Sequence, residues 1–190
     1  MGLNDYSLED IMKYVEEHEE QIELPQKTNS SSNFDIEQIK FKLLTNFGTL
    51  SNRKASPNLC LVEWNGYRRL DLRAWKNDMT IPLKGITFDK GELERLIEFF
   101  SSYSFETPSN NLMREYIAGK AHAKFYDKLC ELSVHDVNGI TWKKEINIID
   151  WGFGKKVDLR KWTVNYDRCS KGISIPFEEF KCLKEMVTKI

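Results

Sequence analysis

A segment of 37 residues that occurs twice constrains this chain more than any other feature. The sequence WNGYRRLDLRAWKNDMTIPLKGITFDKGELERLIEFF, residues 64–100, returns as WGFGKKVDLRKWTVNYDRCSKGISIPFEEFKCLKEMV, residues 151–187. The offset is 87 residues throughout, so that Trp64 corresponds to Trp151. A register kept without a gap over this length indicates duplication of one structural unit. We therefore expect two related modules, and we seek the function in what both share.

Each module is predicted to contain four antiparallel strands followed by one C-terminal helix, which is an α+β fold. Leu70 and Leu72 alternate with charged neighbours, as in a half-buried strand, and Asn65-Gly66 is typical of a hairpin turn. Apolar residues at helical spacing over 93–100 predict an amphipathic helix, with Asp89 and Glu92 as its N-cap pair, whereas the second copy has Pro176 at the cap position. Because so small a module buries little apolar surface by itself, we expect the two to pack together as an intramolecular pseudo-dimer.

Composition divides the chain into three parts. Residues 1–33 carry eight acidic and two basic residues and are predicted to form an acidic N-terminal helix and linker. Residues 34–107 form the first module, and residues 108–190 form a connector and the second module. Within the connector, residues 112–118 are predicted to form a short helix. The net charge of the chain is −1, so an acidic tail is attached to a mildly basic body.

Patterns for catalysis, metal binding or cofactor binding are not found in the sequence. His18, His122 and His135 have no partners at metal-ligand spacing, and the run Gly152–Lys156 lacks the spacing of a phosphate-binding loop. We therefore expect no enzyme, no metal and no cofactor. No apolar run approaches the roughly 18 residues that cross a bilayer, no apolar leader is found, and the four cysteines lack paired spacing. A cytoplasmic, nucleoid-associated or nuclear protein is expected.

The repeated strands combine aromatic and cationic side chains on what the alternation predicts to be one face. These residues are Trp64, Tyr67, Arg68, Arg69, Arg73, Trp75 and Lys84 in the first copy, and Trp151, Lys155, Lys156, Arg160, Trp162 and Lys171 in the second. Rings stack on unpaired bases at about 1–3 kcal/mol each, and cations neutralise phosphates. The pattern predicts binding of single-stranded DNA or RNA. It also fits tryptophans buried in a core beside a solvated basic face.

Two further details of the repeat bear on this face. Asp71 and Asp158 each lie two residues before an arginine of the same strand face, and we expect each carboxylate to orient that arginine or partly neutralise it. Lys84 and Lys171 each precede a glycine, which permits close approach of another backbone.

The arrangement W-N-G-x-x-x-x-D-L-R-x-W, followed by K-G-I-[TS] and an amphipathic helix, resembles the C-terminal domain of the transcriptional coactivator positive cofactor 4 and its compact bacterial relatives. The likeness covers the repeated segment in both copies, extends more weakly over residues 34–102 and 122–190, and leaves out the acidic N-terminus. It implies a curved four-stranded sheet with a helix, dimerisation, and sequence-tolerant binding of single-stranded DNA in the grooves of the sheet.

The resemblance also implies roles for individual residues. Trp64 and Trp151 would stack on bases, and Trp75 and Trp162 match a further aromatic position. The cations would be Arg68, Arg69, Lys155 and Lys156 at the hairpin, Arg73 and Arg160 on the strand, and Lys84 and Lys171 in the K-G-I motif. Members of that family usually carry one copy, so two copies in one chain favour a pseudo-dimer. Phe153 and Pro176 depart from the first copy, and the two sites need not be equivalent.

The sequence therefore favours a DNA-binding or RNA-binding protein without enzymatic activity, acting as a transcriptional coactivator or regulator, or in replication and repair. Its expected partners are single-stranded nucleic acid and the transcription machinery, with no membrane. The alternative is a protein-interaction module that keeps the same fold without binding nucleic acid. DNA or RNA as the ligand, and association of two chains into a homodimer, stay open. We also expect the acidic residues 1–24 to compete with nucleic acid for the basic body.

Overall fold

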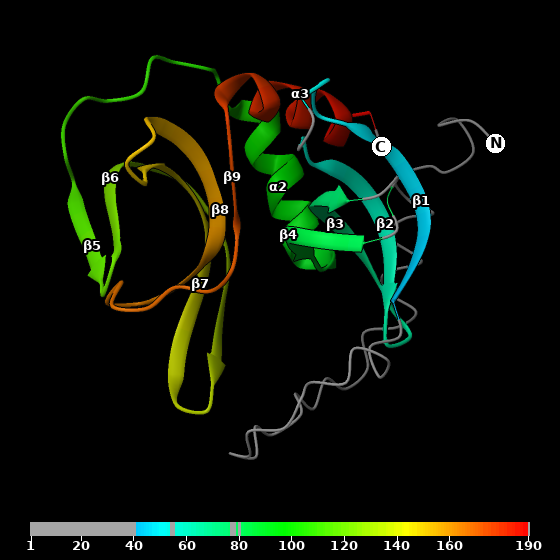
Figure 1. Ribbon diagram of the computed structural model, residues 1–190, viewed down its shortest axis with the longest axis horizontal. Coiled ribbons are helices and arrows are strands. Elements are labelled where there is room, and N and C mark those ends of the chain that lie inside the picture. The colour runs from blue at the N-terminus through cyan, green and yellow to red at the C-terminus, as the bar shows by residue number, and fades with distance from the viewer. Residues whose placement is uncertain (1–40, 54–55, 77–78, 80, 190) are drawn as a thin grey trace.

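The computed structural model describes residues 41–189, with gaps at 54–55, 77–78 and 80. The predicted acidic helix and linker, residues 1–33, lie outside the described residues. The fold is α+β, with two antiparallel sheets of four and five strands and two helices. The helices α2 and α3 lie between the two curved sheets (Figure 1).

The first sheet is an antiparallel meander in the order β1-β2-β3-β4. Its strands are β1 (Phe41–Thr49), β2 (Asn58–Trp64), β3 (Tyr67–Lys76) and β4 (Ile81–Phe88), and α2 (Lys90–Ser102) follows. The turn between β2 and β3 consists of Asn65 and Gly66, both with positive φ, 50° and 89°. Two such residues form the hairpin turn whose twist matches that of the flanking strands, as the sequence predicted.

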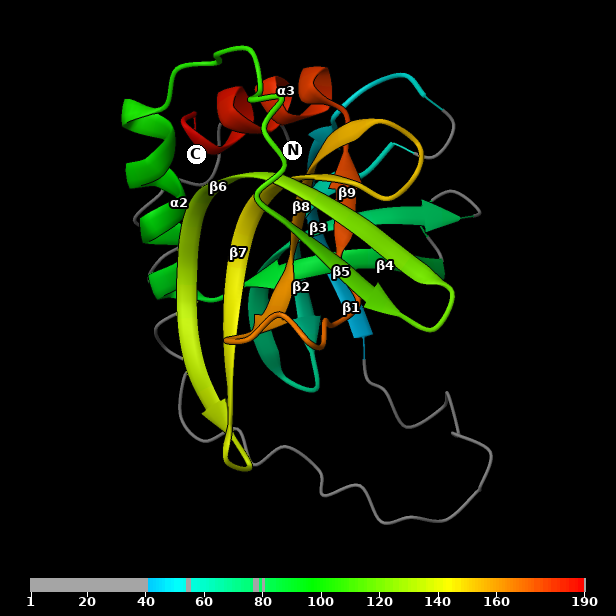
Figure 2. The same ribbon diagram turned by 90° about the vertical axis from the view of Figure 1, so that its left-hand side faces the viewer.

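The second sheet follows the order β5-β6-β7-β8-β9. Its strands are β5 (Arg114–Ala118), β6 (Ala121–Val137), β7 (Ile140–Asp150), β8 (Lys155–Thr163) and β9 (Ile173–Ile175), and α3 (Phe177–Val187) follows. The hairpin of β6 and β7 projects beyond the rest of the sheet (Figures 1 and 2). Asn138 and Gly139, again with positive φ, form its turn.

The prediction of a short helix at residues 112–118 was wrong, because residues 114–118 form the edge strand β5. This strand pairs with β6 in continuous antiparallel register, from Arg114 opposite Phe125 to Ala118 opposite Ala121. Tyr116 is buried while the residues on either side of it are exposed, which is the alternation of a strand. Gly119, at φ 59°, reverses the chain into β6. Pairing with a neighbouring strand thus outweighs the local helical preference of this segment.

The two helices start differently, as their sequences predict. Asp89 caps α2 by accepting a hydrogen bond from the backbone N–H of Glu92, and the Glu92 side chain accepts one from the N–H of Asp89 in return. At the corresponding position of α3, Pro176 makes no side-chain cap. Among the described residues, neither helix has the length and apolarity that a membrane crossing requires.

One apolar core is shared by both sheets and both helices. It includes Leu70 and Leu72 of β3, Val157 and Leu159 of β8, and apolar side chains of α2 and α3. Phe100 of α2 and Phe180 of α3 meet with ring centroids 5.3 Å apart. Residues more than 80 positions apart therefore pack in the same interior, and each sheet covers its aliphatic face with helices.

Each helix carries one buried glutamate that binds residues of the other sheet-and-helix unit. Glu92 of α2 binds Lys144 of β7 in an ion pair and accepts a hydrogen bond from Ser133 at 2.6 Å. Glu179 of α3 forms a bidentate ion pair with Arg53, in which both N···O distances are 2.9 Å. It also accepts a hydrogen bond from the Ser51 hydroxyl at 2.7 Å. The two glutamates correspond at the offset of 87 residues, and each is almost fully buried.

We expect Glu92→Gln to reduce the free energy of unfolding by about 3 kcal/mol at neutral pH, since it leaves the buried Lys144 ammonium without a counter-charge. Urea unfolding followed by circular dichroism measures the change. Glu94→Gln, an exposed position on the same helix, alters the charge equally and should stay within about 0.5 kcal/mol of the wild type. Equal losses in the two variants would contradict a special role for the buried pair.

The same variant should change how stability depends on pH. Burial alone would raise the pKa of Glu92, but the charge of Lys144 and the hydrogen bonds to the carboxylate outweigh it, and the pKa is lowered from 4.5. A lowered carboxyl pKa contributes stability above the unfolded value that is lost as pH falls through the folded value. The difference between wild type and Glu92→Gln should therefore shrink below about pH 4.5, as unfolding at a series of pH values would show.

Candidate nucleic-acid interface

Each sheet has one face toward the helices. We call the other face, which points away from the helices, its Trp face. On β3, Leu70 and Leu72 enter the shared core, so Arg69, Asp71 and Arg73 project from the other side. The Trp faces carry two smaller apolar clusters that are separate from the core. Cys60, Val62 and Trp75 form the first, and Tyr116, Ala123, Phe125, Ile149 and Trp162 the second. The tryptophan rings therefore do not lie beneath the helices.

An aspartate and an arginine form the same ion pair on both Trp faces. Arg73 donates two hydrogen bonds to Asp71, both at 2.8 Å, and Arg160 donates two to Asp158, at 2.5 and 2.7 Å. Both carboxylates are fully buried. Burial raises the pKa of Asp71, and the hydrogen bonds and charge of Arg73 oppose that rise. The expectation that each aspartate orients and neutralises its arginine is confirmed.

This ion pair changes the role available to the two arginines. The side chains of Arg73 and Arg160 are only 14% and 13% exposed, and their charges are already neutralised. Each guanidinium instead lies over a tryptophan ring, Arg73 at 5.3 Å from the centroid of Trp64 and Arg160 at 4.3 Å from that of Trp151. Arg73 and Arg160 were predicted to bind phosphates. Their contacts instead favour a role in holding Trp64 and Trp151 in place through cation–π interactions.

The glycine after each K-G-I lysine lets the next strand pass directly over the arginine. A Cβ on Gly85 would lie 2.6 Å from the carbonyl oxygen of Leu72 and 2.7 Å from Cβ of Arg73. The corresponding Gly172 faces the same two positions of β8, Leu159 and Arg160. Arg73 also donates a hydrogen bond to the carbonyl of Leu83 on β4, at 2.7 Å. The close approach predicted at these glycines is thus present in both sheets.

The Trp face of the first sheet keeps part of its rings exposed and some of its donors unpaired. Trp64 and Tyr67 are half-buried, and Arg69 lies 6.0 Å from the ring centroid of Tyr67. Among the described residues, the buried Nε1 atoms of Trp64 and Trp75 and one buried terminal nitrogen of Arg69 lack a hydrogen-bond partner, as does the Nε1 of Trp162 on the second Trp face. Trp64 is close enough to Asp71 to help lower its pKa, but it does not reach hydrogen-bond geometry. Buried donors without acceptors are costly and are normally satisfied by water or a ligand.

The Trp face of the second sheet is filled by its own side chains. Trp162 is completely buried, and Tyr116 of β5 meets it edge-on at 5.2 Å. Trp151 stacks on Trp162 with centroids 6.1 Å apart and donates its N–H to Asp158 at 3.1 Å. Tyr166 donates a hydrogen bond to the buried Glu145 at 2.9 Å. Trp162, and Trp75 at the corresponding position of the first sheet, are both buried. In this conformation neither of these two predicted contact residues offers a ring face to a base.

Four of the predicted residues do not lie on the Trp faces. Lys84 is two positions before the core residue Ile86, and Lys171 is two positions before the core residue Ile173, so both lysines lie on the side of the chain that faces the core. Arg68 pairs across the hairpin with Glu63, at 3.8 Å. Lys155, opposite Asp150 in the register, donates hydrogen bonds to the carbonyl of Ser109 and the side chain of Asn110. Lys84 and Lys171 are exposed, but they belong to the edges next to β4 and β9.

Several aromatic residues of the two clusters lie outside the prediction. Phe41 covers the first Trp face, 4.5 Å from the ring centroid of Trp64 and 5.3 Å from that of Trp75. On the second face the additional rings are those of Tyr116, Phe125 and Tyr166. Phe41, Tyr116 and Phe125 precede the repeated segment, and Tyr166 has Met79 as its counterpart. Because none of these rings recurs at the offset of 87 residues, comparing the two copies could not identify them.

Metal binding and thiol chemistry find little support among the described residues. Asp89, Glu92 and His135 could bring ligand atoms within 4.8 Å of one another. Glu92 is already bound to the ammonium group of Lys144, however, so a cation there would meet a like charge. The thiol of Cys60 has a pKa raised to about 12, first by burial and then by the charge of Asp71, which leaves it unreactive.

We expect Gly85→Ala to destabilise the protein by about 2 kcal/mol or more, because the added methyl group overlaps β3 beneath it. Gly91→Ala is the matched control, since its Cβ would meet only Asp89 Oδ1, at an ordinary 3.7 Å. Alanine favours a helix over glycine, so this control should be neutral or stabilising by up to about 1 kcal/mol. Thermal unfolding measures both, and equal shifts would contradict the close packing of β4 on Arg73.

Comparison with models of known protein families finds no match to this chain. A search of curated proteins likewise finds no significant relative. The resemblance to the C-terminal domain of positive cofactor 4 therefore rests on the repeated residues alone, and it stays a prediction.

Proposed function

We propose that the two sheet-and-helix units are copies of one module, packed as an intramolecular pseudo-dimer. The strand registers support this, because Asp71 faces Thr87 between β3 and β4 while Asp158 faces Ser174 between β8 and β9, again at an offset of 87 residues. The ion pairs on the Trp faces and the buried glutamates Glu92 and Glu179 keep the same offset. In this arrangement β5 is an addition to the second copy.

We infer that the protein binds single-stranded DNA or RNA without enzymatic action, and that the Trp face of the first sheet is its contact surface. One observation carries this proposal: the half-buried rings of Trp64 and Tyr67 lie on a face away from the helices, and the guanidinium of Arg69 lies 6.0 Å from the Tyr67 ring centroid. Rings can stack on bases, and a guanidinium can bind phosphates. A duplex would offer phosphates but would hide its base faces.

The second copy contributes structure instead of a second site. On its Trp face the corresponding tryptophan donates to Asp158, and Tyr116 and Tyr166 close the cluster. The resemblance to positive cofactor 4 would by itself imply two equivalent surfaces, so we narrow the proposed contacts to Trp64, Tyr67 and Arg69. One strand of nucleic acid should then bind per chain.

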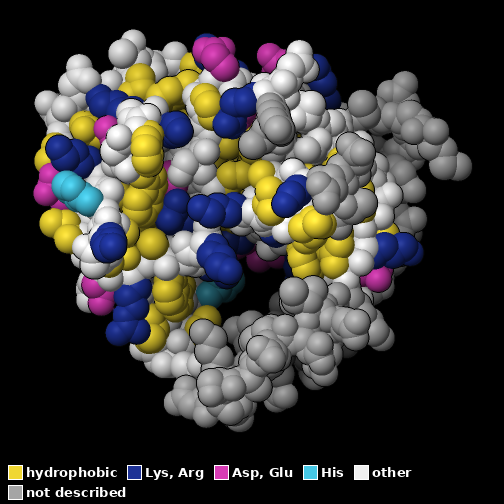
Figure 3. Space-filling model, viewed as in Figure 1, with side chains coloured by type: hydrophobic (Ala, Val, Ile, Leu, Met, Phe, Trp, Pro, Cys, Tyr) yellow, Lys and Arg dark blue, Asp and Glu magenta, His cyan; other side chains and the backbone are white. Residues whose placement is uncertain are grey.

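Exposed lysines supply a cationic path next to this surface. Lys84 lies on β4 and Lys171 lies two residues before β9, and these two edge strands contact each other between the sheets. Lys and Arg side chains gather over the middle of the face seen in Figure 3, around a hollow between the sheets. A strand that leaves the Trp face over the β4 edge would meet Lys84 first, and its phosphates would be neutralised there.

The test is fluorescence anisotropy with a labelled oligo-dT, comparing Arg69→Gln with Lys156→Gln. The two positions correspond at the offset of 87 residues, so both variants remove one charge from the same strand position. We expect Arg69→Gln to weaken binding at least about tenfold, the order of one charge-assisted contact, and Lys156→Gln to weaken it less than about twofold. Trp64→Leu should cost about 1–3 kcal/mol of binding through lost stacking.

Salt dependence and duplex competition complete this test. The logarithm of the affinity should fall with the logarithm of salt concentration, with a slope of about −0.7 for each phosphate contacted. Absence of binding at low salt, or preference for duplex, would overturn the proposal. Equal losses in Arg69→Gln and Lys156→Gln would show that both faces bind. Charge reversal at Arg73 or Arg160 is unsuitable here, because it would place a second carboxylate beside a buried aspartate.

A protein-interaction module is the second candidate, and the edge of the first sheet favours it. Ile81 and Leu83 of the edge strand β4 are exposed at 44% and 43%. An exposed apolar edge strand can pair with a strand of another protein. Under this alternative Arg69→Gln would keep its protein partner, whereas Leu83→Lys would lose it.

A further inference from the structure

A cavity of about 410 Å³ lies away from the Trp faces, where the end of α2 and the connector meet the second sheet. Phe99 of α2 and Tyr103 just beyond it form one wall, with ring centroids 4.6 Å apart. Leu129 of β6 and Ile148 of β7 form the opposite, aliphatic wall. Its size falls within the range of about 300–1,000 Å³ that is usual for small-ligand sites.

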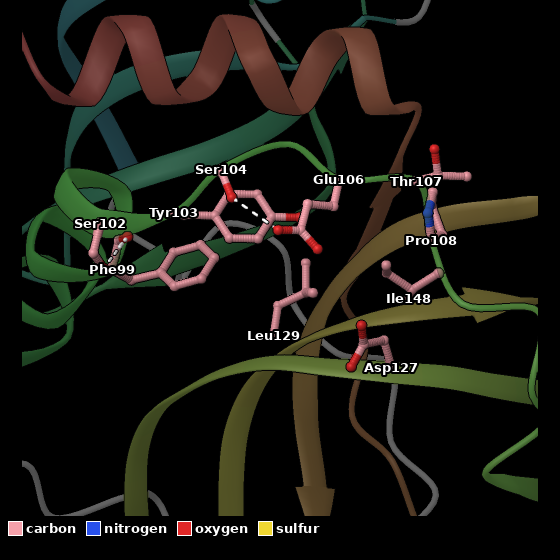
Figure 4. A pocket seen from close by; sticks show the side chains of 10 residues that line it. All are labelled: Phe99, Ser102, Tyr103, Ser104, Glu106, Thr107, Pro108, Asp127, Leu129 and Ile148. Atoms are coloured by element: carbon pink, nitrogen blue, oxygen red, sulfur yellow. Dashed lines mark hydrogen bonds between the residues drawn. The ribbon is translucent and has the colours of Figure 1, made fainter.

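Two carboxylates from different elements border this cavity. Glu106 belongs to the connector and Asp127 to β6, and Figure 4 shows both facing the same space. Within the described part of the chain, Asp127 has no hydrogen bond or ion pair, and Glu106 accepts only a long hydrogen bond from Ser104, at 3.4 Å. A negatively charged pair beside aromatic rings, to which no cation of the described residues is paired, favours a positively charged occupant.

The properties of Tyr103 support a negative field in the cavity. Its pKa is raised by burial first and then by the charges of Asp127 and Glu106. The ammonium group of Lys184 does not line the cavity and donates a hydrogen bond to the backbone carbonyl of Tyr103, at 2.7 Å. The two carboxylates are therefore left for a ligand.

We propose that this cavity binds a primary alkylammonium ion, with its aliphatic chain between the rings of Phe99 and Tyr103 and the Leu129–Ile148 wall, and its ammonium group at Glu106 and Asp127. The hydroxyl groups of Ser102, Ser104 and Thr107 border the same space and accept further hydrogen bonds from the ammonium. The site is independent of the proposed nucleic-acid surface, since its residues come from neither Trp-face cluster.

The test uses two probes of equal length, 1,6-diaminohexane and 1,6-hexanediol, with amide and aromatic chemical shifts of the whole chain as the readout. We expect the diamine, and not the diol, to shift the resonances of Phe99, Tyr103 and Leu129. The double variant Glu106→Gln/Asp127→Asn should weaken diamine binding at least about tenfold. The matched control is Glu94→Gln/Glu98→Gln, two exposed positions on α2, which should bind the diamine as the wild type does.

Several outcomes would overturn the proposal. They are equal shifts with the diol, equal loss of binding in the Glu94/Glu98 control, unchanged binding in the Glu106/Asp127 variant, or no shifts at about 10 mM diamine, a concentration at which even weak sites with millimolar affinity are occupied. If the double variant does not fold, Glu106→Gln alone, at an exposed position, makes the same comparison. The alkylammonium ion could be a free amine or a lysine side chain of a protein partner, and Nα-acetyl-lysine amide as a third probe distinguishes the two. Tighter binding of this probe than of the diamine indicates a lysine side chain, and weaker binding indicates a free amine.

Discussion

The packing of α2 and α3 between the two sheets is the constraint on which the rest of the structure depends. Both helices and the aliphatic faces of both sheets form one apolar core, and Phe100 and Phe180 meet within it. Units of this size bury little surface by themselves, so the shared core adds to the stability of both. Glu92 and Glu179 then fix the relative position of the two halves, because each is bound by a basic and a hydroxyl group from the other half: Glu92 by Lys144 and Ser133 of the second sheet, and Glu179 by Arg53 and Ser51 of the loop between β1 and β2.

Because one face of each sheet packs in the core, the opposite face, the Trp face, does not contribute to that core. Both carry an aspartate–arginine pair beneath a tryptophan, and a glycine on the next strand lets the backbone pass over that arginine. The faces then diverge. In the second sheet, Tyr116 of β5 and Tyr166 pack against Trp162, whereas in the first sheet Phe41 packs against Trp64 and Trp75. Trp64 and its counterpart Trp151 are both half-buried. The two faces therefore keep equivalent tryptophans but surround them with different rings.

Local patterns predicted much of the fold because they depend on neighbouring residues. Strand alternation at Leu70 and Leu72, the Asn65-Gly66 turn and the Asp89 cap were all correct, since period, turn conformation and capping are set within a few residues. Residues 112–118 were predicted wrongly because their conformation is set by pairing with β6. The basic residues were assigned to a single face, although a step of one position along a strand reverses the side, as Arg68 and Lys84 show.

The sequence by itself determined that one strand-and-helix pattern occurs twice, which residues alternate, and which aspartate neutralises which arginine, because these relations hold within a strand or between equivalent positions. Only the tertiary structure decided which aromatic side chains pack against the tryptophans, that the two glutamates cross the core, and that Glu106 and Asp127 border one cavity. Each of these depends on segments far apart in the chain, such as β5 against β8 or the connector against β6, and their meeting is set by the packing of the whole molecule.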